Sequence, residues 1–346
     1  LYEYPLKSVV NAYRSPYIYD FFMAKFVPID KLPTEVGNLL DKAVEEKLSK
    51  LLCHILSGCR IIADSLRAGD EYSTKQVGTQ NSFGDNQLDV DVKTDEVLFN
   101  ALKASGLVKM ASSEENPVEV PCSGSGYCVG FDPLDGSSIY DANFAVGTIM
   151  GIWPGDSLLN RVGRDQVASL ITQYGPRVTM ALAFNKNVTK SGDAISMELT
   201  MTKSGWNVTI PRITIAAKAK TFAPGNLRAT QDNTKYGDLV NYWITNKYTL
   251  RYSGGLVPDV YHILIKGQGV LANASSRSAK AKLRLLFEAA PIALIVEAAE
   301  DSLVFVLARQ KNLWILYPCW MSLFQTWTDA LVCATGAAKK CSASRI

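Results

Sequence analysis

The sequence lacks the features of several common classes of protein. Its 346 residues include only two histidines, so a histidine-rich zinc site is not expected. The formal net charge is +3, and no dense run of lysine and arginine with interleaved aromatic residues occurs, which argues against a nucleic-acid partner. A transmembrane helix needs about 20 apolar residues, and the most apolar stretch, 313–323, is shorter than that. We therefore expect no membrane partner.

Cysteine usage indicates the redox environment. The seven cysteines are odd in number and scattered, and no C-x-x-C pair occurs, which is typical of reduced thiols in an intracellular protein. A length of 346 residues predicts one large or two ordinary domains with a sizeable core. We therefore expect a soluble, globular, intracellular protein. The final tripeptide, 344–346, loosely resembles a peroxisomal signal, but we prefer to interpret it as a chance match.

Two carboxylates follow a short apolar run near the middle of the chain. Residues 127–131 predict a buried strand, and Asp132 and Asp135 come directly after it. Ligand sites of α/β folds lie at such strand ends. Carboxylates held this close repel each other unless they are protonated or bridged by cations, and Mg²⁺ prefers oxygen ligands. We therefore interpret the pair as candidate metal ligands.

A Gly-Ser-Ser sequence continues this motif. Gly136 allows the backbone to approach a ligand closely, and the amides of Ser137 and Ser138 could bind a phosphate group. The alternative is a surface loop, because Asp, Pro, Gly and Ser are the commonest turn residues. The apolar strand before the acids and the Gly-Ser-Ser after them favour the functional interpretation.

Further carboxylates surround this motif in the sequence. Asp85 and Asp91 could reach a common site, although a solvated acidic turn is the alternative for them. Glu114 and Glu115 follow a predicted strand at 107–111. Two strands about 20 residues apart would then each end in an acidic pair, which is less expected by chance than either pair alone.

Hydrophobic periodicity predicts α/β elements first and antiparallel strands later. Predicted helices are 34–67, as one long helix or two abutting ones, 94–105 with Thr94 as N-cap, 238–245, 256–265 and an apolar helix from 285 to 299. Further predicted strands are 145–153, 178–184 and a hairpin of 197–202 with 206–210. Glu288 enters the last helix, and a buried carboxylate without a partner is costly, so it would require a cation. Its alternative is a solvent-facing acid in the first turn.

Taken in order, these segments resemble the fructose-1,6-/sedoheptulose-1,7-bisphosphatase family. The motifs that carry the resemblance are NSFGD (81–85), SSEE (112–115), GFDPLDGSSI (130–139), GRDQV (163–167), PGNLRAT (224–230), TLRYSGG (249–255), VPDV (257–260) and AKAKLRLLFE (279–288). Ile139 after the two serines, together with PGNLRAT, favours the sedoheptulose branch. The resemblance implies a layered α/β fold, a five-layer α-β-α-β-α sandwich. We divide the chain into an irregular segment 1–33, a metal-binding half 34–210, a second half 211–299 and a divergent tail 300–346.

The resemblance also implies a role for each site residue. The metal ligands would be the carboxylates of Asp85, Glu114, Asp132, Asp135 and Glu288, with the carbonyl of Leu134. The pair that activates the attacking water would be Asp91 and Glu115. The groups that bind the departing phosphate would be Gly136, Ser137, Ser138 and Arg284. The residues that hold the distal phosphate and the sugar would be Asn226, Arg251, Tyr252 and Lys282.

The implied reaction is Mg²⁺-dependent hydrolysis of the 1-phosphate of sedoheptulose 1,7-bisphosphate, giving sedoheptulose 7-phosphate and phosphate. Two or three Mg²⁺ ions per subunit, with Mn²⁺ as a substitute, and a homo-dimer or tetramer are implied. The implied compartment is the cytoplasm or a plastid stroma, with a peroxisome-type organelle as the weaker alternative. Alternative functions are a fructose-1,6-bisphosphatase and a non-catalytic phosphosugar-binding relative. An inositol-monophosphatase-like activity is disfavoured, because Arg251 and Lys282 suit a second phosphate.

The sequence departs from the family pattern at several positions. Ala229 and Ala272 stand where fructose-bisphosphatases carry tyrosines that contact the sugar, and the tail from Glu300 onward does not align. The two cysteines that form a regulatory disulfide in plastid members correspond here to Thr74 and Thr79. We therefore predict an activity that is insensitive to dithiol reduction.

The cysteines nearest in sequence to Thr74 and Thr79 do not replace that disulfide. Cys53 and Cys59 lie six residues apart in a predicted helix, about 9 Å by rise alone. That separation exceeds the reach of a disulfide. Cys122 and Cys128 are the other pair that is close in sequence.

Overall fold

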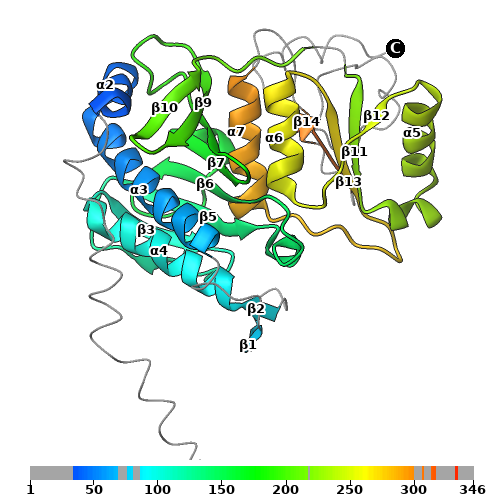
Figure 1. Ribbon diagram of the computed structural model, residues 1–346, viewed down its shortest axis with the longest axis horizontal. Helices are drawn as coiled ribbons and strands as arrows, with labels where there is room; N and C mark the ends of the chain where they lie inside the picture. The colour runs from blue at the N-terminus through cyan, green and yellow to red at the C-terminus, as the bar shows by residue number, and fades with distance from the viewer. Residues whose placement is uncertain are drawn as a thin grey trace, which may run out of the picture.

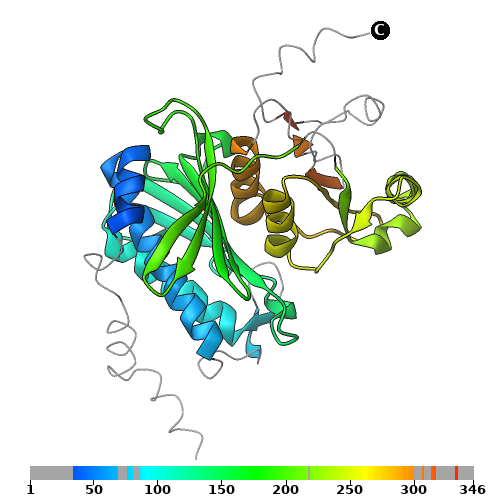
Figure 2. The same ribbon diagram turned by 45° about the horizontal axis from the view of Figure 1, so that its top comes forward.

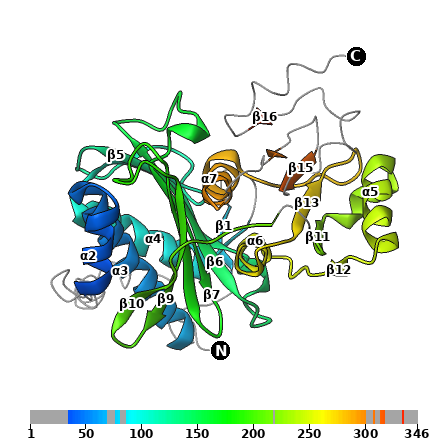
Figure 3. The ribbon, with the colours of Figure 1, turned by 90° about the horizontal axis from the view of Figure 1, so that it is seen from above.

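The computed structural model describes residues 34–68, 76–80, 86–216 and 219–299, with three short strands at 306–307, 313–316 and 332–333. These residues form five layers in the order helix, sheet, helix, sheet, helix (Figures 1 and 3). The predicted layered α/β fold is thus confirmed. Within the described part of the chain, no helix combines the length and apolarity that crossing a bilayer requires.

The first sheet has eight strands in the order β10-β9-β8-β7-β6-β5-β3-β4. Their bounds are β3 Val108–Ser113, β4 Val120–Pro121, β5 Tyr127–Asp135, β6 Val146–Pro154, β7 Ala168–Tyr174, β8 Val178–Phe184, β9 Ile195–Thr202 and β10 Gly205–Ile210. Every neighbouring pair in this sheet is antiparallel except β3 and β5, which run parallel. Because the carboxyl ends of parallel strands meet at one edge, the acidic residues after β3 lie beside those at the end of β5.

Three helices cover one face of this sheet: α2 (Thr34–Ala43), α3 (Glu46–Ala68) and α4 (Asp89–Ser105), next to the small hairpin of β1 (Gln76–Gln80) and β2 (Asn86–Leu88). Their apolar side chains join those of the sheet in one large core. The predicted segment 34–67 therefore forms two abutting helices, one of the two predicted forms.

Helix α4 begins five residues before its predicted start at Thr94. Thr94 does not cap the helix, because its hydroxyl donates to the Val90 carbonyl at 2.8 Å inside the helix. The carboxylate of Asp91 instead accepts the Leu88 amide at 3.2 Å. The predicted C-terminal end is correct, since Gly106 has φ 66°, in the left-handed conformation that ends helices.

The other face of the first sheet packs against α6 (Leu256–Lys266) and α7 (Ala290–Ala298), which lie side by side in the middle layer (Figure 2). A π-helical turn, Leu285–Ala289, leads into α7. The second sheet follows in the order β12-β11-β13-β15, with bounds β12 Thr249–Leu250, β11 Thr221–Gly225, β13 Val270–Ala274 and β15 Leu313–Leu316. Helix α5 (Thr234–Thr245) packs against the face of this sheet away from α6.

Most predicted strands match the structure to within two residues, but several strands were missed, among them three of five or more residues in the two main sheets. Strand β7 carries buried Ser169 and Thr172, which interrupt its apolar pattern. Strand β11 includes Pro224 and Gly225, where the sequence predicts a loop. The prediction is wrong because Pro224 pairs with Ala272 of the third missed strand, β13, in a parallel ladder. The tail from 300 onward contributes β15 to the second sheet, with β14 (Val306–Leu307) and β16 (Val332–Cys333) paired nearby.

Candidate active site

Three of the predicted metal ligands converge at the edge where β3 and β5 end. Glu114, Asp132 and Glu288 each offer one carboxylate oxygen, and these oxygens all lie within 4.8 Å of one another. Glu114 follows β3 directly, and its amide donates to the Phe131 carbonyl of β5 at 3.0 Å. The parallel pairing of β3 and β5 therefore places Glu114 beside Asp132.

Glu288 reaches this edge from the second half of the chain through the π-helical turn. The amides of Glu288 and Ala289 both donate to the Arg284 carbonyl, at 3.0 Å each. Alternate residues of β5 face this turn, and Gly130 stands two residues before Asp132. A Cβ at Gly130 would lie only 3.0 Å from Cγ of Leu286. Glycine at this position therefore allows the turn that carries Glu288 to pack closely on the strand that carries Asp132.

Burial and mutual repulsion make this cluster strongly electronegative. Burial, then the charges of Glu114 and Asp135, raises the pKa of Asp132 well above its ordinary value. Burial, then the charge of Glu114, raises the pKa of Glu288 to about 8. The Arg284 guanidinium offsets part of this repulsion through a 2.7 Å ion pair with Glu114. The donors are carboxylate oxygens whose charges repel one another, which fits a hard divalent cation such as Mg²⁺.

The predicted pair of catalytic acids lies on α4 and after β3. Asp91 is buried, and burial followed by the charge of Glu115 raises its pKa to about 7. The Leu88 amide and the Ser137 side chain lower that pKa by donating hydrogen bonds to the carboxylate. Asp91 is thus close to Glu115 and to the Gly-Ser-Ser motif, and it titrates in a range suited to accepting a proton.

The end of β5 forms a bend that contacts the second half of the chain. Asp135 accepts a 2.6 Å hydrogen bond from the Val257 amide, in the first turn of α6. Its pKa rises to about 6, because burial outweighs this hydrogen bond. The Leu134 amide donates to Asp132 at 3.0 Å. Gly136, with φ 83°, then turns the backbone into the short 3₁₀ helix Ser137–Ile139.

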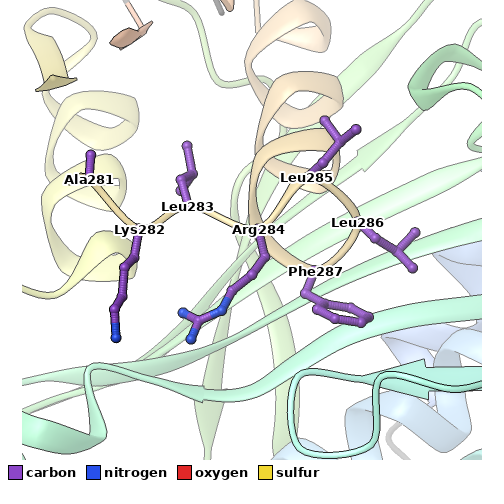
Figure 4. A pocket seen from close by; sticks show the side chains of 7 residues that line it. All are labelled: Ala281, Lys282, Leu283, Arg284, Leu285, Leu286 and Phe287. Carbon is purple, nitrogen blue, oxygen red and sulfur yellow. The ribbon is translucent and has the colours of Figure 1, made fainter. Parts of the chain in front are cut away.

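A pocket of about 470 Å³ opens beside the cluster and is lined by residues 281–287 (Figure 4). In this extended segment, Lys282 and Arg284 point to the same side and Leu283 points to the opposite side. Two cationic side chains thus share one face of the pocket. The predicted phosphate-binding residues Lys282 and Arg284 therefore lie on one face of the pocket, and Arg284 contacts Glu114.

The other predicted substrate residues lie around the second sheet. The side-chain amide of Asn226 donates to the Ala274 carbonyl at 2.7 Å, and its buried Oδ1 has no hydrogen-bond partner among the described residues. Tyr252 is 49% exposed, and its pKa rises through burial and then through the charges of Asp259 and Asp135. Arg251 is exposed and donates to the neighbouring Leu250 carbonyl at 2.8 Å.

Two positions named from the sequence as departures from the family pattern lie in a core of the structure. Ala229 and Ala272 are fully buried in the core beneath α5. Small side chains at these positions are therefore explained by packing in this chain. Asp85 lies outside the described residues, as do Thr74 and the tripeptide 344–346.

Comparisons with known proteins extend over most of the chain. The family described as "Fructose-1-6-bisphosphatase, N-terminal domain" matches residues 34–192, and the corresponding C-terminal domain matches residues 215–302. The chain is 38% identical over 267 residues to the class 1 fructose-1,6-bisphosphatase of Syntrophotalea carbinolica, covering 75% of this chain and 79% of that protein. The chain belongs to the fructose-1,6-bisphosphatase family.

Other members of the fructose-1,6-bisphosphatase family are more similar in sequence. Identity reaches 46% over 261 residues with the chloroplastic sedoheptulose-1,7-bisphosphatase of Chlamydomonas reinhardtii, covering 75% of this chain and 65% of that protein. The chain thus spans about 65% of the length of this relative. A crystal structure of the Leishmania major fructose-1,6-bisphosphatase in holo form matches with a TM-score of 0.67 at 27% identity, covering 76% of this chain and 85% of that one.

Sequence patterns did not identify two residues, Asp95 and Gly130, that support the acidic site without belonging to it. Asp95, 5% exposed, accepts a 2.9 Å hydrogen bond from the Asn116 side chain, next to Glu114 and Glu115. Its spacing of four residues from Asp91 places both on one face of α4 and is the signal that could have identified it. Gly130 gave no signal, because the need for glycine arises only from the packing of Leu286.

Proposed function

We propose that the protein is a sugar-bisphosphatase that hydrolyses the 1-phosphate of sedoheptulose 1,7-bisphosphate with Mg²⁺. The observation that carries this proposal is the cluster of Glu114, Asp132 and Glu288 beside the cationic pocket wall of Lys282 and Arg284. Carboxylates suit divalent cations, and cationic side chains suit phosphates. A site that combines both is suited to bind a phosphate ester through metal ions.

Each residue then has one task in the reaction. Glu114, Asp132 and Glu288 would hold Mg²⁺, with Asp85, Asp135 and the Leu134 carbonyl completing the two or three metal positions. When bound, Mg²⁺ supplies charge neutralisation at the phosphoryl oxygens and lowers the pKa of water. Asp91 and Glu115 accept the proton of the attacking water. The residues that hold the departing phosphate are Gly136, Ser137, Ser138 and Arg284.

The distal phosphate and the sugar would be held by residues of the second half, 211–299. Lys282 and Arg251 supply positive charge, and Tyr252 and Asn226 supply hydrogen bonds. The unpartnered Oδ1 of Asn226 suits a hydroxyl donor. The preference for sedoheptulose is supported by the names of the relatives in Chlamydomonas and in Triticum aestivum, each 46% identical to this chain. Fructose 1,6-bisphosphate is the second candidate, supported by the class 1 fructose-1,6-bisphosphatases.

Assembly and location are further parts of the proposal. We propose a homo-oligomer, a dimer or tetramer, in which the exposed Arg251 reaches a neighbouring subunit. The chloroplastic relatives support a plastid stroma over the cytoplasm. Size-exclusion chromatography with light scattering distinguishes the monomer from both oligomers.

Phosphate release from a panel of sugar mono- and bisphosphates, measured with Mg²⁺, tests the function. We expect kcat/KM for sedoheptulose 1,7-bisphosphate to exceed that for sugar 1-phosphates by orders of magnitude. The Lys282→Ala variant should reduce this preference mainly through KM, as loss of uniform binding does. Lys186→Ala, an exposed lysine in the first half, is the matched control. Equal rates on mono- and bisphosphates would contradict the assignment, and no release from any substrate would favour a non-catalytic relative.

A further inference from the structure

The GRDQV segment before β7 has no task in the reaction described above, yet it contains a buried amide. Gln166 is 1% exposed. Its Nε2 donates to the Gly163 carbonyl at 2.7 Å and to the Ala290 carbonyl at 2.8 Å. Its Oε1 accepts from the Ser169 hydroxyl at 2.9 Å. Both donor hydrogens of the side chain are thus used, and the amide joins three segments of the chain.

One of these hydrogen bonds connects the two halves of the site. Ala290 is the first residue of α7 and stands two residues after Glu288. Glu114 and Asp132 belong to the first half, as does Gln166. The bond from Gln166 to Ala290 therefore ties the segment that carries Glu288 to the half that carries the other two carboxylates.

The surrounding structure leaves room for this amide and for nothing larger. A Cβ at Gly151 of β6 would lie 2.4 Å from Oε1 of Gln166. A second attachment exists near the other end of α7, where Arg164 pairs with Glu297 at 3.4 Å. Since Arg164 is half exposed, solvent weakens that pair. The buried Gln166 is the stronger and more directional of the two attachments.

Apolar packing alone would not fix the position of α7 relative to the first sheet. The helix contacts the first sheet through aliphatic side chains such as Ile292 and Ile295, which meet Ile171 and Ala181. Apolar contacts are not directional, so they tolerate small shifts of the helix along its axis or about it. A hydrogen bond to the Ala290 carbonyl defines the position of the first turn, next to Glu288.

We propose that Gln166 is a positioning residue that sets Glu288 against Glu114 and Asp132 and thereby determines the affinity of the metal site. The proposal rests on the proposed function, because it requires that the three carboxylates bind a divalent cation. Groups that orient a metal ligand without touching the metal change affinity by about 10- to 100-fold when they are replaced.

The test measures Mn²⁺ binding to the full-length, metal-stripped protein by calorimetry, without substrate. Gln166→Met keeps the length of the side chain and removes all three hydrogen bonds. We expect its Kd for Mn²⁺ to rise about tenfold, and kcat to recover largely at saturating metal. Thr172→Val is the matched control, because Thr172 is fully buried in β7 and bonds to Cys59 on the face away from α7. Its Kd should stay within about twofold of the wild-type value even where its Tm falls.

The outcomes separate this proposal from the proposed function. A Gln166→Met protein with a lower Tm and an unchanged Kd would show a merely structural role and overturn the proposal. A wild-type protein that binds no Mn²⁺ would overturn the proposed metal site, and this proposal with it. If Gln166→Met does not fold, Ser169→Ala takes its place, since it removes only the bond that orients the amide. We then expect a threefold or larger rise in Kd, and an unchanged Kd would refute the proposal.

Discussion

Replacing Glu288 with glutamine should stabilise the metal-free protein while it abolishes the metal site. Glu288 is 5% exposed, and its carboxylate accepts a hydrogen bond from the Arg284 amide. Burial and the charge of Glu114 raise its pKa from 4.5 to about 8. The folded protein therefore keeps a proton on Glu288 that the unfolded chain releases, so stability falls as pH rises from 4.5 to about 8.

The magnitude follows from the pH interval. At pH 7, about 2.5 pH units above the ordinary pKa of Glu288, this penalty is about 3 kcal/mol, since one pKa unit corresponds to about 1.4 kcal/mol. At pH 5 the penalty is about 1 kcal/mol or less. Glutamine cannot ionise and still offers an acceptor to the Arg284 amide. In the presence of a chelator, the stability advantage of Glu288→Gln over wild type should therefore be about 2 kcal/mol larger at pH 7 than at pH 5.

Urea unfolding in EDTA at both pH values, repeated with Mg²⁺, measures this difference. With Mg²⁺ the order should reverse, because the cation binds the folded wild type and stabilises it by an amount that grows with the logarithm of the Mg²⁺ concentration above Kd. Glu96→Gln, on the exposed face of α4, controls for the loss of one carboxylate and should show no such pH dependence. A Glu288→Gln protein that is destabilised equally at pH 5 and pH 7 in EDTA would refute the reasoning.

Three further predictions concern the reaction and its control. Asp132→Asn should lower kcat by at least ~10²-fold in saturating Mg²⁺, because metal-based charge stabilisation contributes several kcal/mol; near-wild-type turnover would remove Asp132 from the site. Since Asp91 must be ionised to accept a proton and its pKa is about 7, kcat/KM should fall as pH decreases below 7, and a flat profile from pH 6 to 8 would contradict that role. Incubation with reduced thioredoxin should leave the activity of the oxidised protein unchanged. Cys122 follows β4 and Cys128 lies on β5, and these two strands flank β3 on opposite sides. Two strand spacings place the two cysteines about 9.5 Å apart, beyond the reach of a disulfide. A several-fold activation by reduced thioredoxin would contradict the prediction.

Sequence patterns predicted the acidic residues better than the elements that support them. Asp132 and Glu114 were each predicted at the end of a recognisable apolar strand, and the parallel pairing of β3 and β5 in the structure brings these ends together. Glu288 was predicted to need a cation from its place in an apolar segment. Its position beside Asp132 could not be predicted from periodicity, because it depends on a π-helical turn packed against Gly130.

Two of the missed strands, β7 and β11, share a physical cause. Strand β7 is a central strand whose buried Ser169 and Thr172 are satisfied by Gln166 and Cys59, so its polar residues look like those of a loop. The proline of β11 lies in a ladder although prolines usually mark turns. For Thr172 and Pro224 the partner, Cys59 or Ala272, is distant in sequence, so a single window of sequence does not contain it.

The site lies where the first turns of α6 and α7, from the second half of the chain, meet the ends of strands of the first half. Asp135 at the end of β5 accepts the amide of Val257 at the start of α6, and Gln166 holds the start of α7 beside Glu288. The hydrogen bond to α6 lowers the pKa of Asp135, which reaches about 6, while that of Glu288 reaches about 8. Near pH 7 Asp135 is therefore largely ionised, whereas Glu288 is largely protonated and a cation beside it favours its charged form. Binding of a cation and docking of the second half onto the first must therefore stabilise each other.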